Sequence, residues 1–438
     1  MTAMPHPARA SAGATVFPIL IAISLCHLMN DVMQSMLSAI YPMLKTDFAL
    51  DYWQIGLMTL AFQGTASLLQ PVIGILTDAR PQPWSLPLAS VSTFLGVMVL
   101  AFAPSWPLLI VGAMLIGFGS AIFHPESSRV ARLASGGRFG LAQSVFQVGG
   151  NFGTAIGPLL AAFIVLPFGR GSVAFFGVLA VIAGTILTRV SRWYGAHLKA
   201  RARKPMDKTL PLPRNRVVLA LVVLAFLTFT KNIYMASMSS YYTFYLIDTF
   251  HVDTRTAQLM LFLFLGAVAA GTVLGGPVAD RWGPMAVIWV SILGVLPFTL
   301  ALPHVGLVAS GVLTVLIGLI LASAFSAIVV FAQELLPGRV GMVAGIFFGL
   351  SFGMGGIAAA AAPGPEQRRV IFASGIELPQ VFIVVKIVEP RFKATRPQRI
   401  FIHEIPVTAR SPPGIVSGVD AEFRASHNVI SPECRGRR

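Results

Sequence analysis

Charged residues and cysteines are both scarce in this 438-residue chain. Only 11% of its residues are charged whereas 55% are hydrophobic, a balance outside that of ordinary soluble domains. The two cysteines, Cys26 and Cys434, are too few for a disulfide framework and show no metal-ligand spacing. We therefore expect no disulfide scaffold, metal or cofactor. Hydrophobic residues instead form continuous runs of about 20 residues, which predict an all-α polytopic membrane protein and argue against a β-barrel.

These runs fall into two sets separated by a basic segment. Six precede it, at 16–44, 53–77, 86–102, 106–130, 140–166 and 171–189. Five follow it, at 217–247, 257–279, 285–302, 305–331 and 340–362. The pattern predicts a six-helix half at 1–190, a cytoplasmic linker at 191–216, a second half at 217–362 with five recognisable helices, and a separate tail at 363–438.

Lys and Arg residues in the short loops predict the orientation in the membrane. Thirteen follow even-numbered spans and three follow odd-numbered ones. The thirteen are Arg80, Arg132, Arg138, the eight of the linker, Arg281 and Arg339, and the three are Lys45, Arg170 and Arg255. The N-terminus and the linker are thus predicted to be cytoplasmic in a multi-pass protein of the cell inner membrane. The net charge of +15 is explained by basic residues in the loops beside the spans. We therefore expect the protein to contact the lipid bilayer and not to bind nucleic acid.

An internal repeat relates the two sets of spans. Gly74, Asp78 and Arg80 end the second span, and Gly276, Asp280 and Arg281 end the eighth, with the aspartates 202 positions apart. Arg138 and Arg339 open the fifth and eleventh spans with an offset of 201. Such parallel repeats are typical of transporters that bind substrate near the membrane midplane between two halves.

These turns, together with Gly153-x-x-x-Gly157-Pro158, resemble the loop and antiporter motifs of the major facilitator superfamily. Four further segments resemble the fosmidomycin resistance transporters within it: HPESSRVAR at 124–132, QVGGNFG at 147–153, YMASMSSYYTFY at 234–245 and QELLPGR at 333–339. The resemblance covers 17–360. The first loop motif departs from the usual pattern, because Pro-Gln-Pro follows Arg80 where basic residues are common.

The resemblance implies a monomeric carrier with the superfamily fold that exports fosmidomycin, a small phosphonate, or other toxic compounds in exchange for protons. A channel-like facilitator is an alternative that the polar helix faces leave open. An enzyme is not expected, because Ser127 and Ser128 lack a Gly-x-Ser-x-Gly elbow and no His-Glu-x-x-His occurs.

Ionisable residues inside the first and fourth spans are the candidates for proton coupling. His27, Asn30, Asp31 and Gln34 share one helical face, and an acid within a membrane span indicates function or a structural ion pair. Glu126 and Arg129 are three apart and close enough to pair, so they could form a gate or only end the helix. The candidates for proton coupling are Asp31, Glu126, His27 and His124.

Polar residues of the fifth and seventh spans extend the candidate substrate site. The fifth span carries an amide face and, about 200° away, a glycine face for close helix packing at Gly149, Gly153, Gly157 and Pro158. Lys231 in the seventh span needs a carboxylate, a cavity or an anion, and could face Asp31. The candidates for binding an anionic small molecule are Arg129, Lys231, Gln147, Asn151, Gln34, Tyr234 and Tyr241.

The tail at 363–438 has a different composition from the spans. It holds nine prolines, twelve Lys or Arg and seven Asp or Glu, and no run long enough to cross a membrane. A twelfth helix, expected at this point from the resemblance, is missing. We predict a disordered tail produced by a frame shift near Ala360, with an inactive product as one outcome. A genuine cytoplasmic tail is the alternative.

Overall fold

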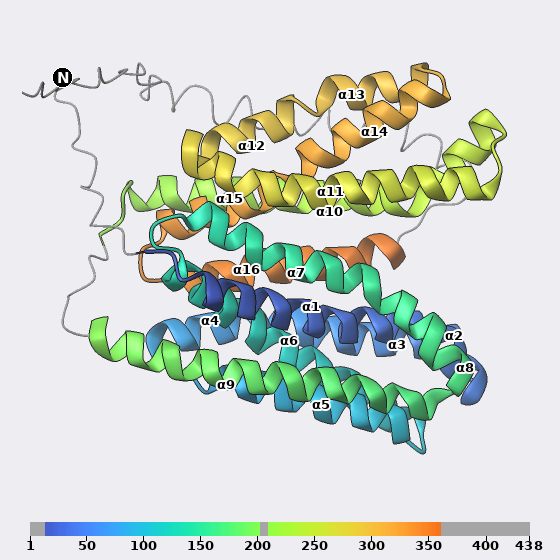
Figure 1. Cartoon of the computed structure of the whole chain (residues 1–438), viewed down its shortest axis with the longest axis horizontal. Coiled ribbons are helices and arrows are strands. Elements are labelled where there is room, and N and C mark those ends of the chain that lie inside the picture. Colours follow the sequence, from blue (N-terminus) through green and yellow to red (C-terminus); the bar gives the residue numbers. More distant parts are fainter. Residues whose placement is uncertain (1–13, 202–208, 361–438) are drawn as a thin grey trace, which may run out of the picture. The chain divides into compact units, whose positions relative to one another are not determined.

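Every element of the computed structural model is a helix within the residues that it describes, 14–201 and 209–360 (Figure 1). The first six predicted spans correspond to α1 (Phe17–Ala39), α2 (Tyr41–Asp47), α3 (Tyr52–Gln63), α4 (Leu69–Ala79), α5 (Ser85–Phe102), α6 (Trp106–Ala134), α7 (Phe139–Leu160), α8 (Leu166–Phe168) and α9 (Phe176–Arg201). The remaining five correspond to α10 (Arg214–Phe250), α11 (Thr254–Trp282), α12 (Pro284–Leu293), α13 (Leu296–Ala301), α14 (Leu307–Ala322), α15 (Ala324–Leu335) and α16 (Val340–Ala360).

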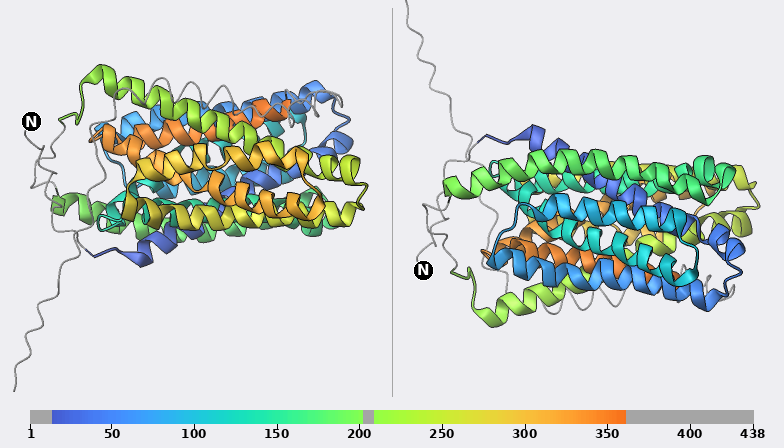
Figure 2. Two further views of the ribbon diagram at one scale, coloured as in Figure 1. Left: turned by 90° about the horizontal axis from the view of Figure 1, so that it is seen from above. Right: turned by 90° about the horizontal axis from the view of Figure 1, so that it is seen from below.

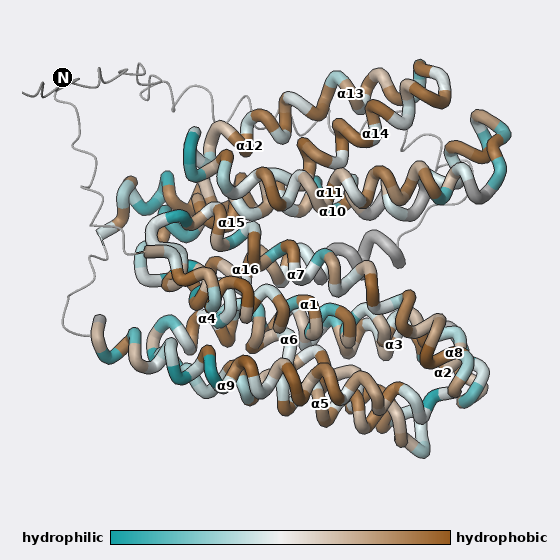
Figure 3. Tube along the Cα trace, in the orientation of Figure 1, coloured by the Kyte–Doolittle hydropathy of each residue, from teal (hydrophilic) through white to brown (hydrophobic). Residues whose placement is uncertain are grey.

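The predicted all-α membrane architecture is confirmed. Ten helical segments of the described chain are long and apolar enough to cross a membrane, and α16 contributes a shorter apolar stretch, Val340–Ser351. Figure 3 shows the same pattern, with hydrophobic residues along the helices and hydrophilic ones gathered near their ends. The predicted tail at 363–438, with its missing twelfth helix, lies outside the described residues.

The predicted linker at 191–216 is partly helical, which the hydropathy pattern did not indicate. Helix α9 continues to Arg201, and α10 begins at Arg214. Tyr194 explains part of the extension, because its ring is fully buried and ties this turn to the helices beside it. Polar residues can therefore continue a helix beyond the apolar run that predicts the span.

Close packing joins the two sets of helices. Helix α1 packs on α7 within the first set. Contacts between the sets include those of α7 with α11, α4 with α16 and α6 with α16. The two views of Figure 2 show the helices running in roughly one common direction. The arrangement follows from small residues on the facing surfaces, which let helix backbones approach closely.

Candidate functional site

Three ionisable side chains meet inside the first set of helices. His27 and Asp31 on α1 and His124 on α6 are all buried. The Nε2 of His27 lies 3.4 Å from Asp31 Oδ2, and the Nε2 of His124 lies 3.7 Å from Asp31 Oδ1. Asp31 Oδ1 also accepts hydrogen bonds from Asn30 Nδ2 at 3.1 Å and Gln34 Nε2 at 3.0 Å. The structure thus gathers Asp31 and both histidines into one group, which we call the Asp31 cluster.

Helix α7 covers this cluster with a glycine and an aromatic ring. The ring of Phe146 stacks on that of His27 with centroids 4.2 Å apart. A Cβ on Gly150 would collide with the His27 ring and lie 2.9 Å from Asp31 Oδ2. Gly149, Gly153 and Gly157 lie against the α1 backbone in the same way. Only small residues on α7 leave room for the cluster.

The Asp31 cluster is the one group of His, Cys, Asp or Glu in the described chain that could surround a cation. Its ligand atoms all lie within 4.8 Å of one another. Two imidazole nitrogens and one carboxylate could hold a proton or a metal ion.

A second buried group centres on Arg129 of α6. Its Nη2 lies 2.6 Å from Asp78 Oδ1 and its Nη1 lies 3.0 Å from Glu126 Oε1, which confirms the predicted Glu126–Arg129 pair. The guanidinium also donates to the Thr77 carbonyl at 2.6 Å and to the Tyr194 hydroxyl at 3.2 Å. Arg129 therefore joins α4, α6 and α9, and its planar fork is directed at protein acceptors.

The loop-motif aspartates each cap a helix of the opposite half. Asp78 accepts hydrogen bonds from the backbone N–H groups of Gly341 at 2.9 Å and Met342 at 2.8 Å. Asp280 accepts from those of Gly140 and Leu141, both at 2.8 Å. Because the first N–H groups of a helix lack partners and carry partial positive charge, a carboxylate there is stabilising. We call this part of the bundle, where α4 and α11 end and α7 and α16 begin, the aspartate end.

Pairs of glycines bring the backbones together at the aspartate end. A Cβ on Gly74 would meet the backbone of Gly341, and a Cβ on Gly276 would meet that of Gly140. These four positions keep the repeat offset and explain why both halves have glycine there. The basic residues of the two motifs, Arg80 and Arg281, are exposed.

Gln333 of α15 adds a polar contact between the halves at the aspartate end. Its Oε1 accepts from Arg132 Nη1 at 3.2 Å, and its Nε2 donates to Ser128 Oγ at 3.1 Å. The Ser128 hydroxyl in turn donates to Gln143 Oε1 at 3.0 Å. The sequence placed Gln333 in a recognisable segment, but no spacing pointed to a partner 205 residues away.

Gln147 and Asn151, on the amide face of α7, form a second polar contact with the other half. Gln147 Nε2 donates to Asn151 Oδ1 at 3.2 Å, and Asn151 Nδ2 donates to Thr272 Oγ1 of α11 at 3.1 Å. The buried Oε1 of Gln147 has no hydrogen-bond partner among the described residues. Thus Gln147 keeps an unused acceptor beside the contact between the halves.

The predicted juxtaposition of Lys231 and Asp31 is wrong. Lys231 Nζ donates to the backbone carbonyls of Ser291 at 3.2 Å and Leu321 at 3.3 Å, both within the second half. The dipoles of these two carbonyls stabilise the ammonium. Tyr234 is also buried there and shares a 3.0 Å hydrogen bond with Thr299 Oγ1. The side chain of Tyr241 lies outside the described residues.

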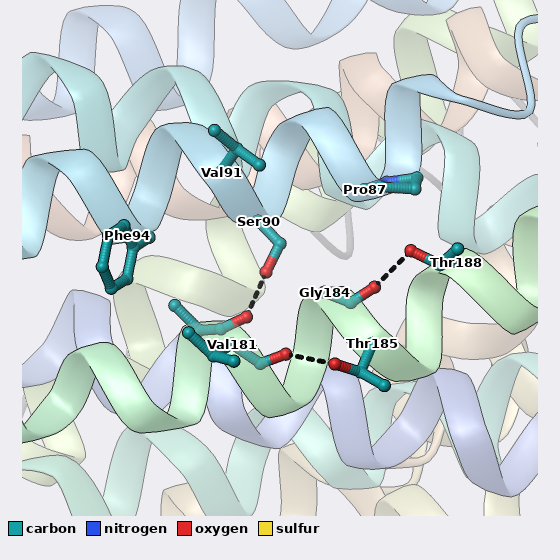
Figure 4. A pocket seen from close by; sticks show the side chains of 9 residues that line it. Pro87, Ser90, Val91, Phe94, Val181, Gly184, Thr185 and Thr188 are labelled. Atoms are coloured by element: carbon teal, nitrogen blue, oxygen red, sulfur yellow. Dashed lines mark hydrogen bonds between the residues drawn. The ribbon is translucent and has the colours of Figure 1, made fainter.

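A groove of ≈ 300 Å³ between α5 and α9 lies apart from these groups. Figure 4 shows Val91, Phe94 and Val181 on its walls and the Ser90 hydroxyl turned to α9. That hydroxyl donates to the Ala180 carbonyl at 2.6 Å. With half of Val91 and Val181 exposed on the apolar outer surface, the groove has the character of a lipid-facing surface.

Two sets of apolar helices that interlock through matched aspartates and enclose buried charges define a polytopic membrane carrier. Residues 23–360 match the model of the Major Facilitator Superfamily. The chain belongs to this family of transporters, and the predicted superfamily fold is confirmed.

Two curated relatives indicate which group within the superfamily the chain resembles. The chain is 57% identical over 366 residues to the fosmidomycin resistance protein of Escherichia coli strain K12, covering 82% of this chain and 90% of that protein. It is 42% identical over 354 residues to the uncharacterized MFS-type transporter YfnC of Bacillus subtilis strain 168, covering 80% and 86%. The predicted membership of the fosmidomycin resistance group is thereby confirmed.

Solved structures share the fold at low sequence identity. The transporter FucP in an outward conformation matches with a TM-score of 0.63 and 16% identity, covering 85% of this chain and 98% of its own. The proton:xylose symporter XylE matches with a TM-score of 0.64 and 14% identity, covering 85% and 96%.

Proposed function

We propose that this protein exports fosmidomycin-like phosphonates, or other small toxic compounds, in exchange for protons by alternating access. The observation that carries the proposal is the Asp31 cluster, a buried carboxylate held between two imidazoles inside membrane-spanning helices. Changing the proton occupancy of such a group changes its charge, which is costly at low dielectric and shifts the balance between conformations. The relation to the fosmidomycin resistance protein supports the substrate class.

The remaining candidate residues take distinct roles in this proposal. Lys231, Gln34, Gln147 and Asn151 bind the anionic substrate together with Tyr234 and Tyr241, while the unused acceptor of Gln147 suits a protonated phosphonate oxygen. Arg129 and Glu126 act with Asp78 as a gate, since their charges already face one another. Transport leaves the substrate chemically unchanged, so the protein is no enzyme.

The proposed setting is the inner membrane, with a monomer whose N-terminus and aspartate end face the cytoplasm. The basic loops support this orientation. The halves at 1–190 and 217–362 would then rock against each other about the contacts of α7 with α11 and α4 with α16.

Export into inverted membrane vesicles tests the function. We expect Asp31→Asn to abolish proton-driven accumulation of a labelled phosphonate while retaining counterflow exchange, because binding and alternation survive loss of the coupling charge. Exchange also separates a carrier from a channel. If Asp31→Asn and Glu126→Gln both retained full proton-dependent export, the coupling role would be wrong.

A further inference from the structure

Both imidazoles of the Asp31 cluster commit one nitrogen to a backbone carbonyl. His27 Nδ1 lies 2.8 Å from the Phe146 carbonyl oxygen. His124 Nδ1 lies 2.9 Å from the Ser120 carbonyl oxygen and 3.2 Å from the Ser120 hydroxyl. A carbonyl oxygen can only accept, so each Nδ1 carries a hydrogen. A neutral imidazole has a single N–H group. If both rings were neutral, both Nε2 atoms would therefore present lone pairs.

The two Nε2 atoms nevertheless lie only 3.1 Å apart. This is the separation of an N–H donor from its acceptor, and two facing lone pairs would repel at this distance. One hydrogen must lie between His27 and His124. The pair thus holds one proton more than two neutral rings would.

Asp31 supplies the compensating charge. Its Oδ1 accepts from both the Asn30 and the Gln34 amides, as suits an ionised carboxylate. A protonated Asp31 could donate to one imidazole, but the Nε2 contact would still lack a hydrogen. One carboxylate and one shared imidazolium proton give zero net charge, which lowers the cost of burial.

Other charged groups near the cluster have their own partners. On α6, Glu126 and Arg129 pair with each other, and Arg129 also pairs with Asp78 of α4 and donates to Tyr194 of α9. On α1, the Cys26 thiol donates to the Ala183 carbonyl. Helices α7 and α16 face the imidazoles with the uncharged residues Phe146, Gly150 and Phe348.

Phe348 brings the second half into contact with the shared proton. Its ring centroid lies 5.2 Å from that of His124 and 6.3 Å from that of His27. The face of an aromatic ring attracts a cation within about 6 Å of its centroid, a distance that His124 meets. Phe348 lies on α16, the helix whose first N–H groups Asp78 caps. One helix of the second half therefore contacts both the proton site and the gate.

We propose that His27 and His124 share one proton balanced by Asp31, and that Phe348 transmits the occupancy of this pair to the second half. Loss of the proton removes the positive charge beside the ring and leaves three acceptors facing one another, which loosens α16 from α6. The proposal rests on proton-coupled export and assigns the transported proton to the imidazole pair, with Asp31 as its counter-charge.

Solid-state ¹⁵N NMR of histidine-labelled protein in lipid bilayers tests the shared proton without any transport measurement. A histidine side chain in water is uncharged at pH 8. We expect one histidine signal set to remain protonated, with a coupling between two ring nitrogens across the hydrogen bond. His27→Gln and His124→Gln should each abolish this nitrogen–nitrogen coupling. Asp31→Asn should leave the histidine pair without its positive charge.

Phe348→Leu tests the transmission, because it removes the aromatic face while keeping an apolar side chain. We expect the protonation midpoint of the pair to fall by about 0.5 to 1 pH unit. Phe325→Leu is the matched control, since Phe325 packs on Phe348 with centroids 5.3 Å apart. The control should leave the midpoint unchanged, and equal shifts in both variants would overturn the role of Phe348.

Two results would overturn the shared proton. One is a pair of neutral rings at pH 8 with no coupling between their nitrogens. The other is a signal set that a zinc chelator alters, which would identify bound metal. If the nitrogen–nitrogen coupling is present but the Asp31→Asn and Glu126→Gln variants export normally, the shared proton is supported and the proposed function is wrong. If the nitrogen–nitrogen coupling is absent but these variants lose proton-driven export, the proposed function is supported and the shared proton is wrong.

Discussion

Asp78 and Asp280 make the same contact with opposite halves of the protein. Each carboxylate accepts two consecutive backbone N–H groups at the first turn of a helix from the other half. Asp78 also pairs with Arg129, whereas Asp280 has no such arginine among the described contacts. The two caps are therefore geometrically alike but differ in charge environment.

Neutralising either aspartate should open the aspartate end. We expect Asp280→Asn to weaken the closed arrangement by about 1–2 kcal/mol, a 5- to 30-fold shift in population. Asp78→Asn should shift it further, because Arg129 also loses a partner. Spin labels replacing the exposed Arg80 and Arg339 would report a longer distance. Unchanged distances in both variants would contradict a gating role.

Removing the Arg129 side chain should destabilise the protein strongly. Arg129→Gln leaves Glu126 buried without its cation, a loss of about 3–5 kcal/mol. Arg129→Lys should recover only part of this, because an ammonium cannot reproduce the forked contacts to Asp78 and Glu126. Thermal unfolding in detergent measures the effect, and Arg80→Gln is the exposed control, expected within about 0.5 kcal/mol.

A double variant measures the interaction between Glu126 and Arg129 itself. Glu126→Gln with Arg129→Gln should cost less than the sum of the single changes, because neither partner is then left as a lone buried charge. Strictly additive losses would show that Glu126 and Arg129 do not interact in the folded protein.

A methyl group at Gly150 should disrupt the Asp31 cluster. Gly150→Ala would collide with the His27 ring, so we expect loss of proton-driven export and a lower unfolding temperature. Gly56→Ala is the matched control, since nothing lies within 4 Å of its Cβ and alanine favours a helix by about 1 kcal/mol. Equal behaviour of the two variants would mean that α7 can shift away at no cost.

Hydropathy and charge predicted the helices because membrane spans depend on local composition. The same reasoning found the repeated Asp78 and Asp280, since both belong to short motifs. It could not find that each caps the opposite half, because the partners are bare backbone N–H groups without a side-chain signature. His27 and His124 were each identified as candidates, but their convergence depends on the register of α1 against α6, which no local pattern encodes.

The incorrect pairing of Lys231 with Asp31 has a related cause. A buried ammonium needs acceptors, and the sequence shows only carboxylates as obvious ones. Lys231 donates to the backbone carbonyls of Ser291 and Leu321, which carry no side-chain signature. The sequence did not identify Phe348 or Tyr194 as part of the site, because aromatic residues at helical spacing are common in packed cores.

Lys231 offers a test of anion recognition. We expect Lys231→Met to reduce fosmidomycin resistance at least tenfold in cells, because the ammonium is the attractive charge proposed for the phosphonate. Resistance to an uncharged substrate, if one is exported, should fall less. A uniform loss for all substrates, with reduced protein in the membrane, would assign Lys231 a structural role through its two carbonyl contacts.

The reading frame of the gene beyond codon 360 can be tested directly. The family match ends at residue 360, where the sequence changes from apolar helix to a basic, proline-rich segment. A superfamily half needs a sixth span, so we expect one of the other two reading frames to encode an apolar run of about 20 residues from that point. Restoring that frame should raise both membrane levels and export. If neither frame contains such a run, the frame-shift explanation fails and the tail is native.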